Sequence, residues 1–241
     1  MRIYAHRGAS AYAPENTLAS FALAKDLGAH FVELDVQRTK DGVLVVMHDD
    51  TPARTTDVTP DRSEWTVGQF TLAELQALDA GSWKDPKYAG EQIPTLDQVL
   101  DLLEEKDLGL LLEAKSPDRF PGLSGQIAAA LRSRPQWMRA GAERLVVESF
   151  DRDFLIEFRA VAPRITLGYL GLPNIVELPF LARFCDQINP HFPSVDVDLV
   201  EAVHGHGMAV TPWTANEPAD IERLRRIGVD GVITDAPDRA R

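Results

Sequence analysis

The sequence contains very little cysteine and no long hydrophobic run. Its 241 residues include one cysteine, Cys185, so no disulfide can form within the chain. No apolar run approaches the length that crosses a membrane. The first residues lack the apolar segment of a signal peptide. We therefore expect a cytoplasmic protein without stable membrane insertion.

Basic residues are also in short supply. The chain has 25 Lys and Arg residues against 37 Asp and Glu residues, which gives a net charge of −12. A surface this acidic argues against nucleic acid as a partner, because such binding needs clustered basic side chains. It does not exclude an anionic small-molecule substrate, since a bound cation can invert the field inside one pocket.

Short apolar segments alternate with amphipathic segments along the whole chain. We expect strands at residues 2–5, 31–36, 109–114, 145–149, 165–170, 186–189, 208–213 and 231–234. We expect helices at residues 19–27, 96–105, 122–134, 153–161, 175–184, 197–206 and 218–227. Such alternation predicts parallel strands joined by right-handed crossovers. Eight strands predict an α/β fold, a TIM (β/α)8 barrel. An open doubly wound sheet is less favoured, because no Gly-x-Gly-x-x-Gly motif follows any strand.

One segment departs from this alternation. The turn Lys40-Asp41-Gly42 predicts that residues 43–47 return as an antiparallel extension of the second strand. Residues 51–92 then follow no strand–helix alternation: Thr, Asp and Pro are dense from 51 to 63, and a short helix is expected at 72–78. We interpret them as a small insertion or cap within a single domain, 1–241. A disordered loop is the alternative, against which stand three large aromatic residues, Trp65, Phe70 and Trp83.

Carboxylates lie within two of the expected strands. Glu33 and Asp35 are two residues apart, so both project from one face of their strand. They are either solvated acids or oxygen ligands for a hard cation. Glu113 lies at the end of the next parallel strand, where it would bring a third carboxylate to the same end of a barrel. A divalent cation, Mg²⁺ or Ca²⁺, would relieve their repulsion. The alternative for Glu113 is a structural ion pair with Lys115.

Two histidines follow strands on the same side. His6 comes directly after the first strand and His48 ends the returning segment. Histidine exchanges protons near neutral pH, and two histidines suit a reaction that needs a base on one side of a bond and an acid on the other. A structural role is the alternative for either histidine alone.

These residues belong to motifs that together resemble one known family. The motifs are His6-Arg7-Gly8, Pro14-Glu15-Asn16-Thr17, Glu33-x-Asp35-Val36, Thr39-x-Asp41-Gly42, His48-Asp49, Glu113-x-Lys115, Pro212-Trp213-Thr214-x-Asn216, Gly228-Val229-Asp230-Gly231 and Thr234-Asp235-x-Pro237. In combination they resemble the glycerophosphodiester phosphodiesterases of the bacterial cytosolic type. The resemblance covers the whole chain and implies a TIM barrel with an insertion after the second strand. Ala114 and Pro212 depart mildly from the family pattern and place only local packing in doubt.

The resemblance also implies a role for each motif residue. His6 and His48 match the catalytic acid–base pair. The implied metal ligands are Glu33, Asp35 and Glu113. The implied substrate-binding residues are Arg7 and Lys115 at the phosphate, Trp213 as an aromatic wall, and Asn16 as a polar support near the first loop.

The implied activity is metal-dependent hydrolysis of a glycerophosphodiester to glycerol 3-phosphate and an alcohol, with one divalent cation as cofactor. We expect His6 to act as base and His48 as acid. A phospholipase C- or D-like barrel acting on lysolipid is the first alternative, and it would need an exposed apolar rim. The second is a barrel that only binds phosphate esters. The sequence leaves homodimer formation open.

Overall fold

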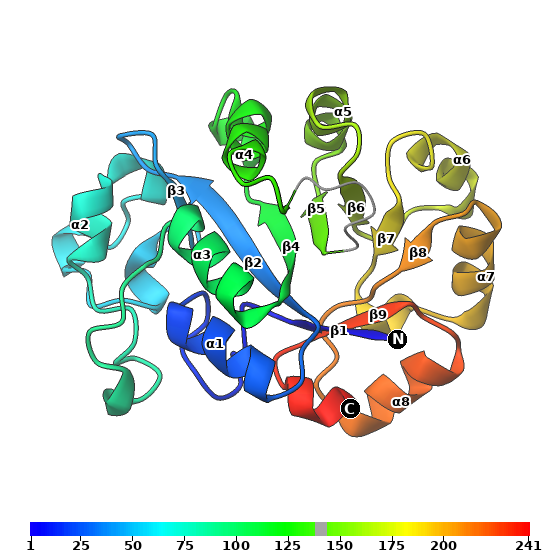
Figure 1. Cartoon of the computed structure of the whole chain (residues 1–241), viewed down its shortest axis with the longest axis horizontal. Helices are drawn as coiled ribbons and strands as arrows, with labels where there is room; N and C mark the ends of the chain where they lie inside the picture. Colours follow the sequence, from blue (N-terminus) through cyan, green and yellow to red (C-terminus); the bar gives the residue numbers. More distant parts are fainter. Residues whose placement is uncertain (138–143) are drawn as a thin grey trace.

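The computed structural model describes residues 1–137 and 144–241. In the described part, eight parallel strands follow one another around a nearly closed barrel, in the order β8-β7-β6-β5-β4-β2-β1-β9 (Figure 1). Their bounds are β1 Arg2–Ala5, β2 Phe31–Arg38, β4 Gly109–Ala114, β5 Leu145–Ser149, β6 Thr166–Leu170, β7 Gln187–Asn189, β8 Ala209–Val210 and β9 Gly231–Thr234. The predicted TIM-barrel fold is confirmed.

The barrel closes between β8 and β9 through individual backbone hydrogen bonds. The amide of Ile233 donates to the carbonyl of Pro212 at 2.9 Å, and the amide of Asp230 donates to that of Val210 at 2.9 Å. β8 is shorter than the strand predicted at 208–213, because Pro212 has no amide hydrogen to donate to a ladder.

Helices connect the strands and cover the barrel. Their bounds are α1 Leu18–Asp26, α2 Leu72–Gln76, α3 Leu96–Lys106, α4 Leu123–Arg132, α5 Arg152–Val161, α6 Leu178–Leu181, α7 Val197–Gly205 and α8 Pro218–Arg226. α1 and α3 begin at Thr17 and Thr95, whose hydroxyls accept from backbone amides in the first turn. α6 is shorter than the helix predicted at 175–184. It begins only next to Pro179, and the 3₁₀ turn η6 Ile175–Glu177 precedes it.

Successive side chains along each strand point alternately into the barrel and toward the helices, and this produces two separate apolar clusters. The inward cluster fills the base of the barrel with Tyr4, Phe31, Leu111, Val146 and Ile233. Residues of opposite parity, such as Val32 and Leu34, pack against the helices in the larger outer cluster. Because side chains two apart share a face, the inward direction of Phe31 places Glu33 and Asp35 inside the barrel.

β2 continues beyond the barrel as one arm of a hairpin. β3 Leu44–Val46 pairs antiparallel with its end, as the turn residues predicted. The turn closes where the amide of Gly42 donates to the carbonyl of Thr39 at 3.0 Å. The amide of Met47 then donates to the carbonyl of Asp35 at 2.9 Å, which returns the chain to the barrel just before His48.

The segment predicted as an insertion lies between β3 and α3. Its buried residues form a cluster of their own with the hairpin: Val45, Met47, Val67, Phe70, Leu75, Ala80 and Ile93. Of the three aromatic residues expected to pack, Phe70 is buried, whereas Trp65 and Trp83 are exposed. The helix expected at 72–78 is present as α2. The assignment of residues 51–92 as a cap within one domain stays a prediction.

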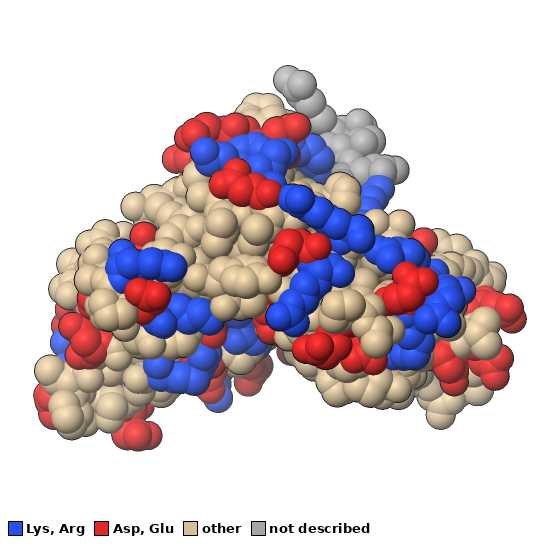
Figure 2. All heavy atoms as spheres, turned by 90° about the horizontal axis from the view of Figure 1, so that it is seen from below, with Lys and Arg blue, Asp and Glu red and all other residues tan. Residues whose placement is uncertain are grey.

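Charged side chains of both signs are interspersed on the face shown in Figure 2. Lys and Arg lie beside Asp and Glu there rather than forming one basic area (Figure 2). Among the described residues, none of the helices has the length and apolarity needed to cross a membrane.

Candidate active site

Three buried carboxylates meet inside the mouth of the barrel. Glu33 and Asp35 come from β2, and Glu113 comes from β4, where it is the register partner of Asp35. One oxygen of each lies within 4.8 Å of one oxygen of the other two. The structure thus brings the three predicted metal ligands together.

Charge within this cluster is unevenly balanced. Burial and the neighbouring carboxylate of Asp35 raise the pKa of Glu33 and of Glu113 well above the usual range. Burial acts in the same direction on Asp35, but Arg7 and Lys115 hold its pKa below the usual value. Glu33 and Glu113 are therefore protonated more readily than free glutamate. A bound cation would favour their ionised forms and so lower both pKa values.

The donor atoms fit a hard divalent cation. Asp35 Oδ1 and Asn16 Oδ1 are buried oxygens without a hydrogen-bond partner among the described residues. Such orphaned oxygens are costly unless a further group binds them. All-oxygen ligation by carboxylates is the chemistry of Mg²⁺ and Ca²⁺ sites. The cluster can therefore hold a metal ion.

Two cationic side chains border the acids. The backbone amide of Arg7 donates to Glu33 Oε2 at 2.9 Å, and its guanidinium Nε lies 3.4 Å from Asp35 Oδ2. Lys115 Nζ lies 2.9 Å from Glu113 Oε1, so the ion pair considered as a structural alternative is present. Both side chains also line the cavity described below, where an anion could reach them.

The turn that carries His6 and Arg7 has a strained backbone. Arg7 has φ 55° and Gly8 has φ 83°, both in the left-handed region. A Cβ on Gly8 would lie 2.3 Å from Ser20 Oγ. Glycine at this position lets the turn lie directly against α1. The amide of Arg7 is thereby directed at Glu33.

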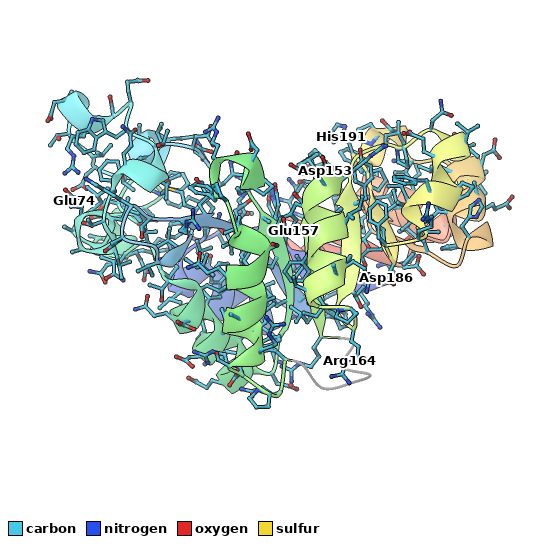
Figure 3. The ribbon with its side chains drawn as sticks, turned by 90° about the horizontal axis from the view of Figure 1, so that it is seen from above. Glu74, Asp153, Glu157, Arg164, Asp186 and His191 are labelled. Carbon is cyan, nitrogen blue, oxygen red and sulfur yellow. The ribbon has the colours of Figure 1, made fainter. Side chains whose placement is uncertain are left out.

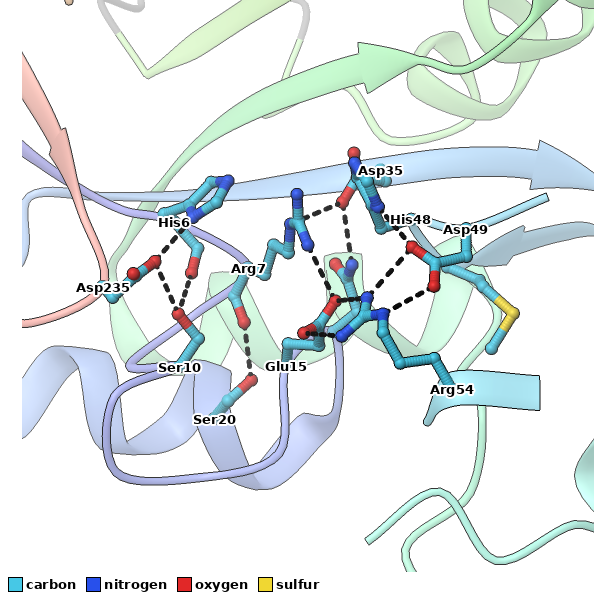
Figure 4. A network of polar contacts seen from close by, with 12 residues as sticks. His6, Arg7, Ser10, Glu15, Ser20, Asp35, His48, Asp49, Arg54 and Asp235 are labelled. Carbon is cyan, nitrogen blue, oxygen red and sulfur yellow. Dashed lines mark hydrogen bonds and ion pairs between the residues drawn. The ribbon is translucent and has the colours of Figure 1, made fainter. Parts of the chain in front are cut away.

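His6 is oriented by a carboxylate from the far end of the chain. Asp235 directly follows β9, and its Oδ1 lies 2.6 Å from Nδ1 of His6 (Figure 4). Asp235 also accepts from the Ser10 hydroxyl at 3.0 Å and from the Asn216 amide at 2.6 Å. Despite burial, these partners lower the pKa of Asp235 to about 2. An ionised partner at Nδ1 leaves Nε2 of His6 to exchange a proton.

His48 is oriented in the same way by its neighbour. Its Nδ1 lies 2.6 Å from Asp49 Oδ1, and Arg54 binds the same carboxylate at 2.6 Å through Nε (Figure 4). Arg54, in the 3₁₀ turn η1 Pro52–Arg54, also donates two hydrogen bonds to Glu15, which pairs with Arg7. This network links the start of the predicted insertion to the first loop. Burial lowers the pKa of His48 itself.

A cavity of about 220 Å³ opens between these groups. Its polar wall contains His6, Arg7, Glu33, His48, Glu113, Lys115 and Glu148. Its apolar wall contains Phe150, Leu170, Trp213 and Ile233. The ring of Trp213 packs edge-on against Phe150 with centroids 5.9 Å apart.

Asn16 is the one predicted substrate-binding residue outside the wall of this cavity. It is buried, and its amide donates to Asp35 Oδ2 at 2.8 Å. The structure therefore places Asn16 behind the acid cluster, where it orients a carboxylate.

Sequence reasoning did not assign several residues of the site. Asp49 and Asp235 both belong to the motifs given above, and Asp235 also follows the last expected strand, but the sequence assigned a role to neither. Glu148 is a fourth buried acid in the cavity. It accepts from Asn189, and burial raises its pKa to about 8. The sequence feature that could have identified Glu148 is its position as a carboxylate near the end of an expected strand. Arg54 lies in an irregular segment, and its sequence neighbourhood carried no signal.

Known proteins resemble this chain in sequence and in fold. A model of the glycerophosphoryl diester phosphodiesterase family matches residues 6–239. A glycerophosphodiester phosphodiesterase of Caldanaerobacter subterraneus subsp. tengcongensis is 38% identical over 239 residues, which cover 98% of this chain and 94% of that protein. One from Bacillus subtilis is 34% identical over 249 residues, covering 97% and 83%. A solved phosphodiesterase of Oleispira antarctica, in complex with the product sn-glycerol-3-phosphate, has a TM-score of 0.87 and 34% identity and covers 100% of this chain and 95% of that one.

Proposed function

The chain belongs to the glycerophosphoryl diester phosphodiesterase family and is a glycerophosphodiester phosphodiesterase, and from this premise we propose how its site hydrolyses the substrate. The products are glycerol 3-phosphate and a free alcohol. The single observation that carries the proposal is the paired arrangement of His6 and His48. Each has a carboxylate 2.6 Å from Nδ1, and both line one cavity with two cations.

The phosphate binds between Arg7 and Lys115. Their charges meet the negative charge that spreads over the phosphate oxygens as the diester reacts. A divalent cation held by Glu33, Asp35 and Glu113 would supply further electrostatic stabilisation of that charge. The alcohol substituent lies against Trp213.

The two histidines divide the proton transfers. His6 takes the proton of the nucleophile, which is the glycerol hydroxyl beside the phosphate, and a cyclic phosphate forms. His48 gives a proton to the leaving alcohol. Burial lowers the pKa of His48 and so disfavours the protonated form that this role needs, whereas the negative charge of the bound phosphate would favour it. Water then opens the cyclic phosphate.

The test is hydrolysis of a panel of glycerophosphodiesters by metal-stripped protein, with Mg²⁺ or Ca²⁺ added back. We expect glycerol 3-phosphate to appear only with added metal. His6→Ala should abolish hydrolysis and still bind the metal, which calorimetry measures. Full activity of His6→Ala would contradict the acid–base proposal, and unchanged activity after exhaustive EDTA treatment would contradict the metal requirement.

Two further expectations accompany this proposal. We propose that the enzyme acts in the cytoplasm, and fractionation of cells tests the location. Homodimer formation is tested by sedimentation of the purified chain. Neither outcome alters the chemistry of the site.

A further inference from the structure

The guanidinium of Arg54 binds two carboxylates at once. Its Nε and Nη2 donate to the two oxygens of Asp49 at 2.6 and 3.0 Å (Figure 4). Its Nη1 and Nη2 donate to the two oxygens of Glu15 at 2.8 and 2.7 Å (Figure 4). A guanidinium can do this because its N–H donors form one planar fork. A single side chain thus occupies all four oxygens.

Each of these carboxylates holds a different group of the active site. Asp49 Oδ1 lies 2.6 Å from Nδ1 of His48, which the proposed mechanism makes the acid. Glu15 Oε1 accepts from Nη1 of Arg7 at 2.9 Å, and Arg7 is a cation proposed to bind the phosphate. Arg54 does not line the cavity itself. It nevertheless connects the proton donor to one of the phosphate-binding cations.

The charges of Glu15 and Asp49 depend on this cation. Burial would raise the pKa of Glu15, but hydrogen bonds and charges from Arg54 and Arg7 hold it below the usual value. Burial acts in the same direction on Asp49, where hydrogen bonds from Arg54 and His48 lower the pKa to about 2. The side chain of Glu15 is only 12% exposed, so water compensates poorly for a lost partner. Removal of Arg54 would therefore release both carboxylates from their present positions.

The backbone that carries Arg54 is fixed, whereas its side chain is accessible. Pro52 and Thr55, before and after Arg54, are buried. The amide of Thr55 donates to the carbonyl of Pro52 at 3.3 Å and closes the 3₁₀ turn η1. The side chain of Arg54 is 46% exposed, so its replacement by alanine opens no cavity in the core. A large effect of that replacement on catalysis would come from the lost contacts with Glu15 and Asp49.

On the basis of the proposed function, we propose that Arg54 is a positioning residue, which sets the place of the His48 ring relative to the phosphate at Arg7. Through Asp49 it fixes the ring, and through Glu15 it fixes the guanidinium of Arg7. Arg54 itself touches no reacting atom. A displacement of about 1 Å between reacting groups can lower a rate about 100-fold, so a residue outside the cavity can control the reaction in this way.

An ion pair that only stabilises the fold is the alternative role for Arg54. Arg62 offers such a pair within the same predicted insertion, because its Nη2 donates to Glu74 Oε1 at 2.8 Å. Figure 3 shows Glu74 at the outer side of the predicted insertion, away from His191, which follows β7 at the barrel mouth. The guanidinium of Arg62 also lies 4.4 Å from the ring centroid of Phe70. Arg62→Ala is therefore a matched control that removes an arginine ion pair and some packing without reaching the active site.

The first test measures kcat and KM for glycerophosphocholine with saturating divalent cation. We expect Arg54→Ala to lower kcat about 100-fold and to raise KM, because His48 and Arg7 both lose their support. Arg54→Lys should restore only part of the activity, since an ammonium group cannot form the fork to two carboxylates. Arg62→Ala should keep both constants.

Combined variants show whether Arg54 acts through its two carboxylate partners. Asp49→Asn should act mainly on kcat and Glu15→Gln mainly on KM. Adding Arg54→Ala to the variant that carries both changes should cost about twofold or less, because the contacts of Arg54 are already lost.

A readout that needs no turnover is the NMR signal of the His48 ring. The proton on Nδ1 should resonate far downfield while Asp49 accepts it. Arg54→Ala should weaken or abolish this signal, and Arg62→Ala should retain it.

The outcomes separate this inference from the proposed function. If kcat and KM of Arg54→Ala stay within about twofold of the unmodified protein, the inference is wrong and the proposed function stands. Equal kinetic losses in Arg54→Ala and Arg62→Ala, with equal decreases in Tm, would show a role in stability alone and overturn it as well. An inactive unmodified protein would overturn the proposed function, and the NMR signal of His48 would still decide whether Arg54 holds that ring in place.

Discussion

Each candidate catalytic histidine has a carboxylate 2.6 Å from its Nδ1, and the two carboxylates come from different parts of the chain. Asp49 is the neighbour of His48, whereas Asp235 is 229 residues from His6. Both aspartates contact Nδ1, so neither contacts Nε2 of its histidine. In the mechanism that we propose, they hold the tautomer and stabilise the imidazolium that forms during proton transfer.

Replacement of Asp235 tests this role at His6. We expect Asp235→Asn to lower kcat about 100-fold or more with a small change in KM, because the amide no longer stabilises the charged ring. Steady-state kinetics with glycerophosphocholine measures it. Asp238→Asn is the control, since Asp238 accepts from Tyr12 at the surface and contacts no histidine among the described residues. Equal kcat in the two variants would show that His6 needs no carboxylate partner.

The titration of His48 is a second prediction for a single residue. Burial places its folded pKa below the ordinary value of 6.5. A lowered pKa means that the folded chain binds this proton less readily than the unfolded chain does. The contribution of His48 to the stability of the fold is therefore fully present above its unfolded pKa of 6.5. It is lost as the pH falls from that value through the lower pKa of the folded chain.

NMR titration of the His48 ring in metal-stripped protein measures this pKa directly. We expect a midpoint below 6.5, and a lower one still in Asp49→Asn, because the hydrogen bond to Asp49 raises the pKa. A midpoint at or above 6.5 in the unmodified chain would contradict the effect of burial.

Among the elements, β2 could be read from sequence in most detail. Its alternation of apolar and acidic residues placed Glu33 and Asp35 on one face, and the turn ending in Gly42 predicted the hairpin that returns His48. Local periodicity carries this information. It carries nothing about pairs distant in sequence, so the bond between His6 and Asp235 could not be derived. Irregular segments such as the one with Arg54 have no period to read.

The turn between β1 and α1 offers a prediction for a whole element. In Gly8→Ala, the new Cβ would lie 2.3 Å from Ser20 Oγ, in addition to the cost of its φ of 83°. We expect the free energy of unfolding to fall by about 2 kcal/mol or more and activity to fall with it, because Arg7 would shift. Urea unfolding measures the change.

Gly90→Ala is the matched control for that turn. Gly90 has φ 86°, but a Cβ at this position would have no described atom outside its chain neighbours within 4 Å. Its substitution should cost only about 1 kcal/mol, the backbone part alone. Equal losses in the two variants would show that the contact with α1 does not restrict the turn.

On the scale of the whole molecule, an acidic chain places three buried carboxylates at one point. The net charge is −12, and the pKa values of Glu33 and Glu113 are raised well above the usual range. Without metal, ionising these two acids in the folded state is unfavourable. The metal-free protein therefore loses stability from them as pH rises above the ordinary value of 4.5 for glutamate.

A divalent cation bound by the cluster should reverse that trend. It favours the ionised acids, so metal binding releases protons and tightens as pH rises. We expect Mg²⁺ or Ca²⁺ at a hundredfold excess over Kd to stabilise the fold by about 2.7 kcal/mol, and the gain in Tm over EDTA-treated protein to increase from pH 5 to pH 8. Thermal unfolding at constant ionic strength measures it. Glu33→Gln should raise the Tm of the stripped protein and remove most of the response to metal, whereas Glu105→Gln, which changes an exposed acid, should do neither. A gain in Tm that is independent of pH, or equal in both variants, would place the metal elsewhere.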